Sequence, residues 1–247
     1  MTYLIIGASS GLGRELAEEF AKKNKNLLLI SRDERDLLAI KSDLTLKYNI
    51  RVDYISLDFS SLSQINEKLL SSEDLINKIQ GVLFPVGLMF DNDNFETDSD
   101  NILKLINTNY LSITYTISKL LQYFKEKNSS IVGFGSVSGL LGRNLNSNYA
   151  ASKRALESYF ESLAFEKKFK EINIQFYILG YLDTNLAFGK NLLLPKGSTK
   201  KLAGIVFKNL NKKFKKKYFP FFWSFVAIIL KIIPFSIILL LKRFLNK

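Results

Sequence analysis

A tyrosine and a lysine four residues apart have the types and the spacing for acid–base chemistry: Tyr149 and Lys153, in the stretch NYAASKRALESYF. Residues four apart on a helix share one face. A nearby ammonium group favours phenolate over phenol, so the pair predicts a pKa for Tyr149 below the ordinary value of about 10. A tyrosine tuned in this way can act as acid or base without histidine.

The composition narrows the chemistry to such a group. The 247 residues include no histidine and no cysteine, which excludes imidazole bases, thiolate nucleophiles, disulfides and the usual ligand sets for zinc. We therefore expect no metal site. A chain of this length has room for one sizeable core, so a single α/β domain is expected rather than two.

The Tyr–Lys spacing alone is weak evidence, because Tyr115 and Lys119 show it too. The later pair differs in having Ser136 thirteen residues before Tyr149, where the predicted strand SIVGF runs into the glycine-containing loop GSVSG. Ligands of parallel sheets bind at the carboxyl ends of strands. The serine hydroxyl is therefore expected where a ligand would lie.

Three glycines, Gly7, Gly11 and Gly13, lie between a predicted strand, YLIIG, and a predicted helix. Glycine permits a sharp turn and a close approach of the backbone to a pyrophosphate, and the following helix N-terminus offers free N–H groups. A tight turn between strand and helix can need glycines for its own sake. The order of strand, glycines and helix nevertheless favours a nucleotide site.

The residues after the second predicted strand, LLLIS, favour NADP(H) over NAD(H). An NAD-specific site usually places an acid there for the ribose 2′-hydroxyl, whereas this chain has Ser31 and Arg32, with Arg14 after the third glycine. Guanidinium groups suit a 2′-phosphate. Asp33, one residue further on, keeps an acid contact to the ribose open as the alternative.

Short apolar runs rich in β-forming residues alternate with longer stretches of helical period. Strands alternating with helices imply parallel strands joined by right-handed crossovers. The expected fold is therefore α/β, a doubly wound, Rossmann-type parallel sheet of about seven strands. We expect this domain to cover residues 1–220 and an apolar helical extension to cover residues 221–247. Helices are predicted over residues 12–23, 34–48, 62–70, 101–125, 148–169 and 198–211.

Taken together, these features resemble the short-chain dehydrogenase/reductase family over residues 2 to about 220. The shared motifs, in the family's order, are GASSGLG at 7–13, Asp58 after the third strand, Asn109 in INTNYL, Ser136, and YAASK at 149–153. The resemblance implies reversible oxidoreduction between a carbonyl and an alcohol, with reduction favoured if the cofactor is NADPH.

The resemblance also implies a role for each matched residue. Tyr149 would donate a proton to a carbonyl oxygen as hydride arrives from the nicotinamide. Lys153 would bind the nicotinamide ribose and lower the pKa of the tyrosine, Ser136 would hold the substrate oxygen, and Asn109 would support a proton-relay water. Asp58 would contact the adenine. The implied cofactor contacts are Gly7, Ser9, Ser10, Gly11, Leu12, Gly13, Arg14, Arg32, Asp58, Gly87, Tyr149, Lys153, Gly180 and Thr184.

Two motifs depart from the family pattern. The family's Asn-Asn-Ala-Gly after the fourth strand is here FPVG, which shares only Gly87. Its Pro-Gly after the sixth strand is here LG, with Gly180, while Thr184 stands where the family contacts the carboxamide. Neither change removes a catalytic group. A non-catalytic cofactor sensor on the same fold stays open as an alternative function.

The net charge of +12 comes entirely from the last quarter of the chain. Up to Asp183, 21 Lys and Arg stand against 23 Asp and Glu, whereas 14 basic residues and no acidic ones follow. Together with the apolar run FVAIILKIIPFSIILLLKRF, this segment predicts binding to an anionic membrane surface rather than to nucleic acid. Lys231 and Pro234 favour a pair of short membrane-dipping helices over a single span. Burial of the tail in an oligomer interface or over the active site is the alternative.

A reductase at a membrane gains most from a substrate that is there too. The core, the FPVG variant and the tail resemble bacterial reductases of keto sugars on polyprenyl phosphate, as in decaprenylphosphoryl-ribose epimerisation, where a partner oxidase makes the ketone. A lipid ketone of the 3-ketosphinganine, long-chain acyl or steroid type is the second candidate. The segment 181–198 is expected to form the lid over either substrate.

The first residues, MTYLIIG, predict a strand rather than a secretory signal. We therefore expect the catalytic domain at the cytoplasmic face of the membrane, as a homo-oligomer.

Overall fold

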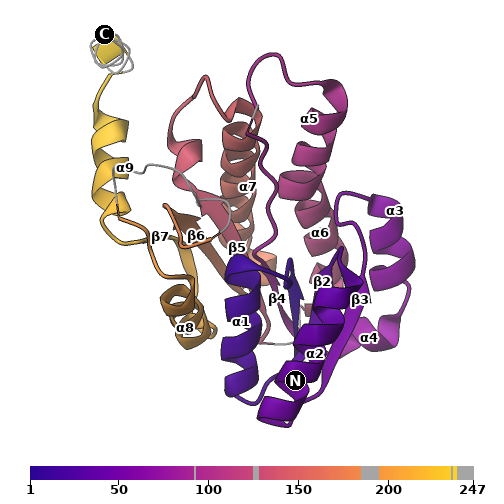
Figure 1. The fold of residues 1–247 in the computed structure, drawn as a ribbon. Coiled ribbons are helices and arrows are strands. Elements are labelled where there is room, and N and C mark those ends of the chain that lie inside the picture. The colour runs from indigo at the N-terminus through magenta and orange to yellow at the C-terminus, as the bar shows by residue number, and fades with distance from the viewer. Residues whose placement is uncertain (92, 125–127, 185–194, 235, 238–247) are drawn as a thin grey trace.

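The computed structural model describes residues 1–91, 93–124, 128–184, 195–234 and 236–237 (Figure 1). Its strands are β1 (Thr2–Ile6), β2 (Asn26–Ser31), β3 (Val52–Ser56), β4 (Ile79–Phe84), β5 (Ser130–Ser136), β6 (Asn173–Leu179) and β7 (Phe214–Phe219). Its α-helices are α1 (Gly11–Lys22), α2 (Glu34–Tyr48), α3 (Leu62–Gln64), α4 (Glu73–Asn77), α5 (Ser99–Ile106), α6 (Ser112–Phe124), α7 (Ser147–Phe165), α8 (Thr199–Asn209) and α9 (Trp223–Ile232). Shorter helical turns are η1 (Ile65–Leu70), η2 (Asn107–Leu111), η3 (Val137–Leu140) and η4 (Lys167–Phe169).

The seven strands form one sheet in the order β3-β2-β1-β4-β5-β6-β7. Every neighbouring pair is parallel, so each connection crosses from one end of the sheet to the other. The strand order runs outward in one direction from β1 and in the other from β4, as in a doubly wound sheet. The predicted fold class is confirmed.

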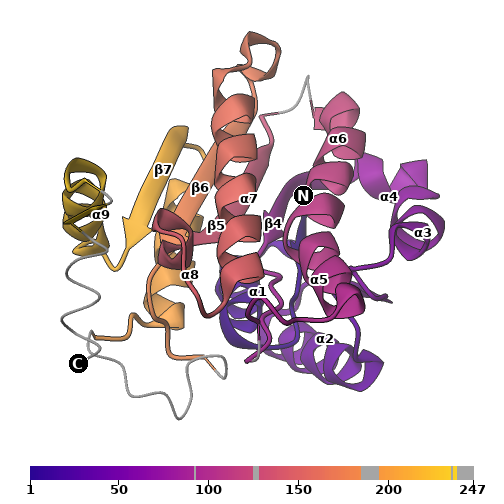
Figure 2. The same ribbon diagram turned by 90° about the horizontal axis from the view of Figure 1, so that it is seen from above.

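Helices cover both faces of the sheet, and each face has its own apolar core. Figure 2 shows α5, α6 and α7 on one side of the strands and α1, α2 and α8 on the other. The strands read as nearly continuous apolar runs because both of their faces are buried. Alternate residues of β1 enter the two cores: Tyr3 and Ile5 pack with α1, while Leu4 and Ile6 pack with α6 and α7.

The long helix expected over residues 101–125 is interrupted. It begins earlier, because the Asp98 carboxylate accepts a hydrogen bond from the backbone N–H of Asn101 at 2.8 Å and so caps α5. The five residues of η2 then form a π-helical turn between α5 and α6. Such turns are frequent at functional sites, and this one contains Asn109.

The basic run before the apolar tail forms the edge strand β7 rather than a free cationic stripe. Its Lys216 lies 2.5 Å from a carboxylate oxygen of Glu157 and 3.0 Å from one of Glu161, both on α7. These ion pairs are largely shielded from solvent. At least this part of the positive excess therefore serves the packing of the domain.

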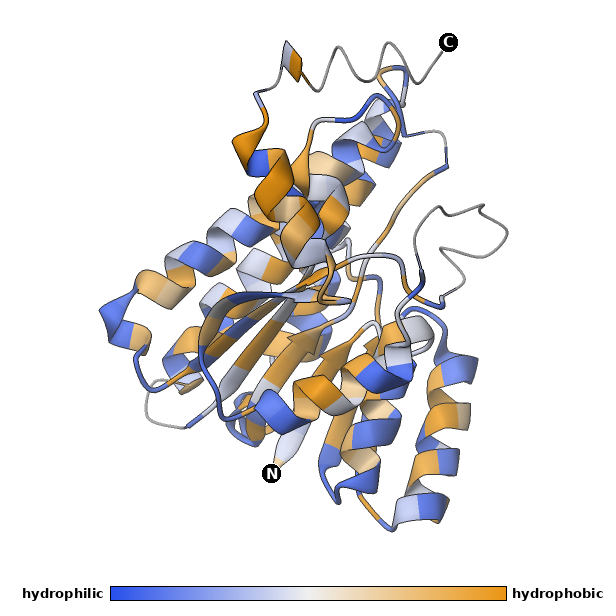
Figure 3. Cartoon of the chain, turned by 90° about the vertical axis from the view of Figure 1, so that its left-hand side faces the viewer, coloured by the Kyte–Doolittle hydropathy of each residue, from blue (hydrophilic) through white to orange (hydrophobic). Residues whose placement is uncertain are grey.

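The apolar tail starts with α9, which lies beside β7 at the edge of the sheet (Figures 1 and 2). The helix ends at Ile232 because the residue before a proline, here Ile233, is restricted to extended conformations. Figure 3 shows apolar residues along most of α9. Trp223 and Ala227 are buried, whereas the exposed apolar side chains are Phe221, Phe225, Ile228, Ile229 and Ile232.

In the described part of the chain, no helix combines the length and the apolarity needed to cross a membrane. The expected second helix of the membrane-dipping pair falls mostly on residues 238–247, outside the described residues. Most of the expected lid, residues 185–194, lies outside them too.

Candidate active site

A cavity of about 860 Å³ lies across the carboxyl ends of the central strands. It spans the gap between β1 and β4, the point from which the strand order runs outward in both directions, and ligands of such sheets bind there. The predicted site residues that line it are Gly7, Ser9, Ser10, Gly11, Leu12, Arg32, Asp58, Gly87, Ser136, Tyr149, Lys153, Gly180 and Thr184. Gly13, Arg14 and Asn109 do not line it.

The glycine turn forms a cradle that side chains would fill. Gly7 has a φ of +95°, and a Cβ there would lie 2.9 Å from the backbone nitrogen of Val86. A Cβ on Gly13 would lie 1.9 Å from the carbonyl oxygen of Gly7, so this glycine permits α1 to pack directly on the turn. Gly11, with a φ of +50°, has Thr184 against it.

The start of α1 is free to bind an anion. Ser10 is the N-cap residue but makes no capping hydrogen bond with its side chain, and the first turn contains no acidic residue. The backbone N–H groups and the positive end of the helix dipole therefore face the cavity without a competing partner. These residues fit the pyrophosphate of a dinucleotide.

The end of β2 is arranged around Arg32. Ser31 donates a hydrogen bond from its hydroxyl to the Ser9 hydroxyl at 2.8 Å, which ties the second strand to the glycine turn. Asp33 caps α2 by accepting from the backbone N–H of Arg35 at 2.9 Å, and it pairs with the Arg35 guanidinium at 3.3 Å. The Asp33 carboxylate thus has partners of its own, while the exposed Arg32 lines the cavity.

Asp58 follows β3 and lines the same end of the cavity. Burial raises the pKa of the Asp58 carboxyl group. Hydrogen bonds from the backbone and hydroxyl of Ser60, together with the charges of Lys104 and Arg32, outweigh burial, so the pKa is lower than usual. One carboxylate oxygen accepts both Ser60 bonds, at 2.9 and 2.8 Å. Asp58 is therefore an ionised acceptor at the end where the resemblance places the adenine.

Arg14 lies outside the cavity, contrary to its expected contact with the 2′-phosphate. It is exposed on α1, and its charge acts on Glu18, one turn further along the helix. Gly13 turns inward against the strand, so the next residue points away. Of the two arginines expected at this phosphate, the structure brings only Arg32 to the cavity wall.

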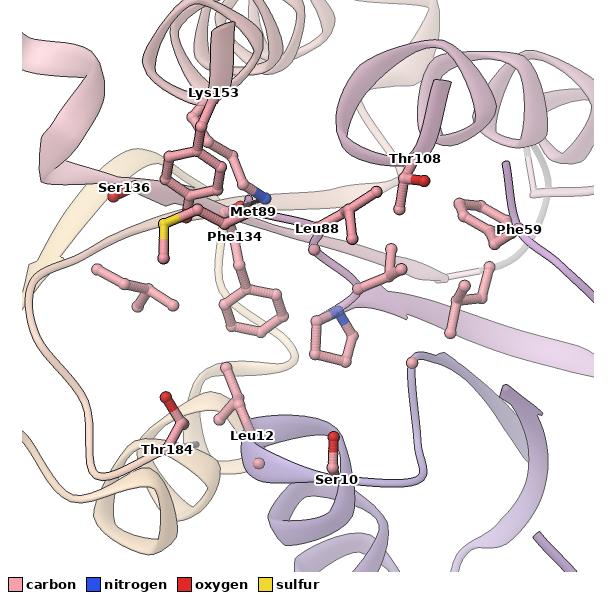
Figure 4. A pocket seen from close by; sticks show the side chains of 18 of the residues that line it. Ser10, Leu12, Phe59, Leu88, Met89, Thr108, Phe134, Ser136, Lys153 and Thr184 are labelled. Atoms are coloured by element: carbon pink, nitrogen blue, oxygen red, sulfur yellow. Dashed lines mark hydrogen bonds between the residues drawn. The ribbon is translucent and has the colours of Figure 1, made fainter. Parts of the chain in front are cut away.

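At the other end of the cavity, Lys153 projects from α7 and points its Nζ inward, opposite Ser10, Leu12 and Thr184 (Figure 4). The ammonium donates a hydrogen bond to the carbonyl oxygen of Phe134 at 3.2 Å and lies 5.9 Å from the centre of the Tyr149 ring. Only 5% of the residue is exposed. Burial lowers the pKa of Lys153 from 10.5 to about 8.

The predicted lowering of the Tyr149 pKa is wrong for this structure. Desolvation by the surrounding protein raises the pKa of the phenol, and the hydrogen bond with Ser136 and the charge of Arg143 offset this only in part. The Nζ of Lys153 donates instead to a backbone carbonyl. Sequence spacing placed the two groups on one face but could not indicate the solvation around them.

Asn109 lies beneath the cavity and is fully buried in the π-helical turn η2. Its side-chain oxygen accepts from the backbone N–H of Leu88 at 2.8 Å, and its amide donates to the Leu88 carbonyl at 2.7 Å and to the Ser152 hydroxyl at 3.3 Å. Both amide hydrogens are therefore used. Asn109 joins η2 to the segment after β4 and to α7.

The two motifs that depart from the family pattern still reach the cavity. A Cβ on Gly87 would lie 3.6 Å from the Lys153 Nζ and 3.7 Å from the Asn109 side-chain oxygen, so the backbone of FPVG lies close to both. Gly180 is covered by an indole: a Cβ there would lie 1.9 Å from the Nε1 of Trp223. The first residue of α9 thus packs directly on the cavity wall.

Sequence reasoning missed Asp93, a buried residue of the segment between β4 and α5. Its carboxylate accepts hydrogen bonds from the backbone N–H of Tyr149 at 2.7 Å and from the backbone and side chain of Asn148 at 3.1 and 2.8 Å. The N-cap residue of α7, Asn146, makes no capping bond with its own side chain. Asp93 fills that place from 55 residues away, so no local sequence signal could have revealed it.

The sequence matches the short chain dehydrogenase family over residues 1–191. It is 31% identical over 199 residues to a very-long-chain 3-oxoacyl-CoA reductase of Vanderwaltozyma polyspora, with 74% of this chain and 55% of that protein covered. It is 27% identical over 236 residues to a hydroxysteroid 11-beta-dehydrogenase 1-like protein of Xenopus laevis, with 92% and 80% covered. The chain thus spans about half the length of the first of these relatives.

Solved structures show the same fold. A short-chain dehydrogenase from Sphingobium yanoikuyae, in complex with NADPH, superposes with a TM-score of 0.76 at 23% identity, covering 88% of this chain and 86% of that one. The match over residues 1–191, the parallel seven-stranded sheet and the cavity at its carboxyl edge agree with one another. The chain belongs to the short-chain dehydrogenase family.

Proposed function

We propose that this protein is an NADP(H)-dependent reductase of a ketone carried on a long apolar group, and that it works at a membrane surface. The observation that carries the substrate class is the position of α9. Its buried Trp223 covers Gly180 and contacts the ring of Tyr181, both in the cavity wall, while Phe225 and Ile229 face outward. A cavity joined directly to an exposed apolar helix suits a substrate that stays partly in lipid.

The groups at the catalytic end suit reduction. When bound, NADPH would supply the hydride that reduces the carbonyl carbon. Because burial raises the pKa of Tyr149, its phenol is protonated at neutral pH and can donate a proton to the carbonyl oxygen. Ser136, which lies in the cavity wall with Tyr149 and lowers the pKa of its phenol, would hold that oxygen. Lys153 is charged below pH about 8 and would stabilise the phenolate left behind.

NADP(H) is the proposed cofactor because of Arg32. Arg32 lines the cavity beside the glycine turn, and Asp33 is already engaged by α2. We expect Arg32→Ala to raise the KM for NADPH about 10-fold or more and to leave the KM for NADH nearly unchanged, since a charge-assisted contact to a phosphate contributes roughly 1.5–3 kcal/mol. Arg51→Ala, which removes a surface arginine paired with Asp53, is the control. An equal effect on both cofactors would contradict the assignment.

The names of the relatives support a lipid ketone. The yeast relative is called a reductase of very-long-chain 3-oxoacyl-CoA and the frog relative is 11-beta-hydroxysteroid dehydrogenase-like, so both refer to substrates with large apolar parts. Neither name refers to a keto sugar on polyprenyl phosphate, the first candidate from the sequence. We therefore propose the lipid ketone, and the keto sugar becomes the competing arm of the test. The basic lysines of the last quarter support the anionic cytoplasmic leaflet as the membrane face.

The test is NADPH oxidation by the full chain with anionic vesicles, offered a long-chain 3-oxoacyl thioester, a steroid ketone and a polyprenyl-phosphate keto sugar. We expect turnover with one of the first two, and a loss of about 10²- to 10⁴-fold in Tyr149→Phe. Tyr115→Phe is the matched control, because Tyr115 lies in α6 and hydrogen-bonds Asn66 away from the cavity.

Turnover of the keto sugar alone would overturn the proposed substrate class. A Tyr149→Phe protein as active as its parent would overturn the proposed chemistry. Binding of NADPH without turnover of any ketone would favour the cofactor sensor instead.

A further inference from the structure

Arg143 lies at the substrate end of the cavity, in the loop between η3 and α7. Its Nη1 donates a hydrogen bond to the Ser138 hydroxyl at 3.0 Å, and the backbone N–H of Ser138 donates to the Ser136 hydroxyl at 3.1 Å. Its charge also acts on the phenol of Tyr149. The guanidinium is therefore connected to the reacting groups, yet the residue is exposed and most of its N–H donors are free for a ligand.

Arg143 lines the cavity, unlike the exposed Arg14 and Arg154, and within the described part of the chain it has no carboxylate partner, unlike Arg35 and Arg51. Arg35 and Arg51 lie on the surface with carboxylate partners, at 3.3 Å from Asp33 and 2.7 Å from Asp53. Among the described residues, no carboxylate lies within ion-pair distance of Arg143, whose only protein partner is the neutral hydroxyl of Ser138. An unpaired guanidinium in a cavity wall has the charge and the donor geometry to bind an anionic ligand.

The acids of the cavity wall lie at its other end. The acids that line the cavity, Asp33, Asp36 and Asp58, follow β2 and β3. Three strand spacings separate β2 from β5, about 14 Å. No Asp or Glu occurs after Asp183, so residues 185–194 contain none.

Arg143 is also distinct from the phosphate contacts of the cofactor. Arg32 and the glycine turn belong to β2 and β1, whereas Arg143 follows β5 and lies with Ser136 and Tyr149. An anion bound at Arg143 therefore belongs to the molecule whose carbonyl these two residues hold.

We propose that Arg143 forms a subsite for a phosphate group carried by the ketone substrate, so that the enzyme selects ketones with an anionic head and an apolar body. This proposal rests on the proposed function and adds an anionic group to the apolar ketone that it assigns as substrate. The planar fork of guanidinium donors matches phosphate oxygens bidentately. The phosphate can come from a thioester carrier such as coenzyme A or from a lipid phosphate, and α9 accounts for the apolar part in both cases.

The first test compares matched substrates on Arg143→Gln. We expect kcat/KM for a 3-oxoacyl-CoA to fall roughly 10- to 100-fold more than that for the N-acetylcysteamine thioester of the same acyl chain, which lacks phosphate. A keto lipid phosphate and its dephosphorylated ketone form the second pair. The pair that shows the selective loss identifies the source of the phosphate. Arg154→Gln, on α7 but outside the cavity, is the control and should affect none of the four substrates.

Equal losses on charged and neutral ketones would overturn the proposal, because Arg143 would then act only through Tyr149 or the fold. The proposal would also be overturned if Arg143→Gln left kcat/KM unchanged for all four substrates. Arg143→Lys should restore part of the rate on the charged ketone, since lysine keeps the charge but not the planar fork.

A binding measurement separates this proposal from the proposed function. With the cofactor site saturated by NADP⁺, inorganic pyrophosphate is titrated calorimetrically into the folded protein. We expect binding by the parent and by Tyr149→Phe, and at least 10-fold weaker binding by Arg143→Gln. Identical titrations of parent and Arg143→Gln would overturn the subsite, whether or not any ketone is reduced.

Discussion

At the scale of single residues, the site combines a buried ammonium, on Lys153, with the partly buried phenol of Tyr149. Lys153 and Tyr149 were identified from their types and spacing, together with Ser136 thirteen residues upstream. The pKa of Tyr149 was expected to be lowered, but burial raises it. Burial also lowers the pKa of Lys153. Residue spacing shows which side chains share a helix face, so this part could be predicted from the sequence. The solvation of those side chains depends on all the elements packed around them and could not.

The pKa of Lys153 predicts a pH-dependent stability. Below pH about 8 the buried lysine is charged in both the folded and the unfolded protein, and its burial destabilises the folded state. Between pH about 8 and 10.5 the folded state releases the proton that the unfolded state keeps, so stability rises with pH. Without cofactor, Lys153→Met should therefore melt at a higher temperature than the parent at pH 7, by an amount equivalent to roughly 3 kcal/mol.

That difference should shrink when both proteins are melted at pH 10. Lys119→Met, which removes an exposed lysine of α6, controls for the loss of one charge and should show no such trend. A constant difference between parent and Lys153→Met from pH 7 to pH 10 would contradict the lowered pKa.

At the scale of elements, the position of the catalytic helix depends on a distant carboxylate. Asp93 holds the first N–H groups of α7, including that of Tyr149 itself, through hydrogen bonds of 2.7 to 3.1 Å. The sequence predicted α7 from its pattern but not this contact, because a carboxylate that caps a helix from another segment leaves no signal at the helix. The same holds for Trp223, whose contact with Gly180 joins segments 43 residues apart.

Asp93→Ala should lower the free energy of unfolding by about 2–3 kcal/mol, measured by urea denaturation, because it leaves partly buried N–H groups without their acceptor. It should also lower kcat more than it raises the KM for NADPH, since the tyrosine shifts with its backbone. Asp93→Asn keeps an acceptor and should recover part of both losses.

Asp98→Ala is the matched control for Asp93. It removes the cap of α5, which holds Asn101 at 2.8 Å, and should cost about 1 kcal/mol without changing kcat. If the two alanine variants changed kcat equally, Asp93 would have no special part in positioning Tyr149.

Gly180→Ala tests the contact between α9 and the cavity. Its Cβ would lie 1.9 Å from the Trp223 indole, so α9 must move. Trp223 is the single tryptophan of the chain, and its emission should shift to longer wavelength as the ring gains solvent, with a loss of about 1–3 kcal/mol in stability. Gly204→Ala, where nothing lies within 4 Å of the new Cβ in α8, should leave the emission unchanged and raise stability by up to about 1 kcal/mol. An unshifted spectrum in Gly180→Ala would show that α9 is not held there.

At the scale of the whole molecule, the fold was predictable and the arrangement of the tail was not. Alternating strands and helices require a doubly wound parallel sheet, because right-handed crossovers leave little choice. From the distribution of charge along the chain, the basic run and the apolar run were predicted to bind a membrane together. In three dimensions β7 takes the basic run into the sheet edge, where Lys216 pairs with Glu157 and Glu161. Among the described residues of the tail, α9 contributes most of the exposed apolar side chains.

The full chain should therefore bind anionic vesicles through α9. Ile229→Glu should reduce the fraction that floats with phosphatidylserine vesicles several-fold, while turnover of a water-soluble ketone stays unchanged. Leu46→Glu replaces an apolar side chain that is 86% exposed on α2, far along the sheet from α9, and should not affect flotation. Equal flotation of all three proteins would contradict the membrane surface.

The order of the strands also has a consequence for synthesis on the ribosome. β1 cannot pair with its second neighbour, β4, until more than 70 further residues have been synthesised. The long sequence separation makes this pairing slow to nucleate. β7 and α9 emerge after β6, the last partner that they need. The apolar helix α9 thus leaves the exit tunnel when a nearly complete sheet can already bind its tryptophan. This order shortens the time for which the apolar side chains of α9 are exposed on an unfolded chain.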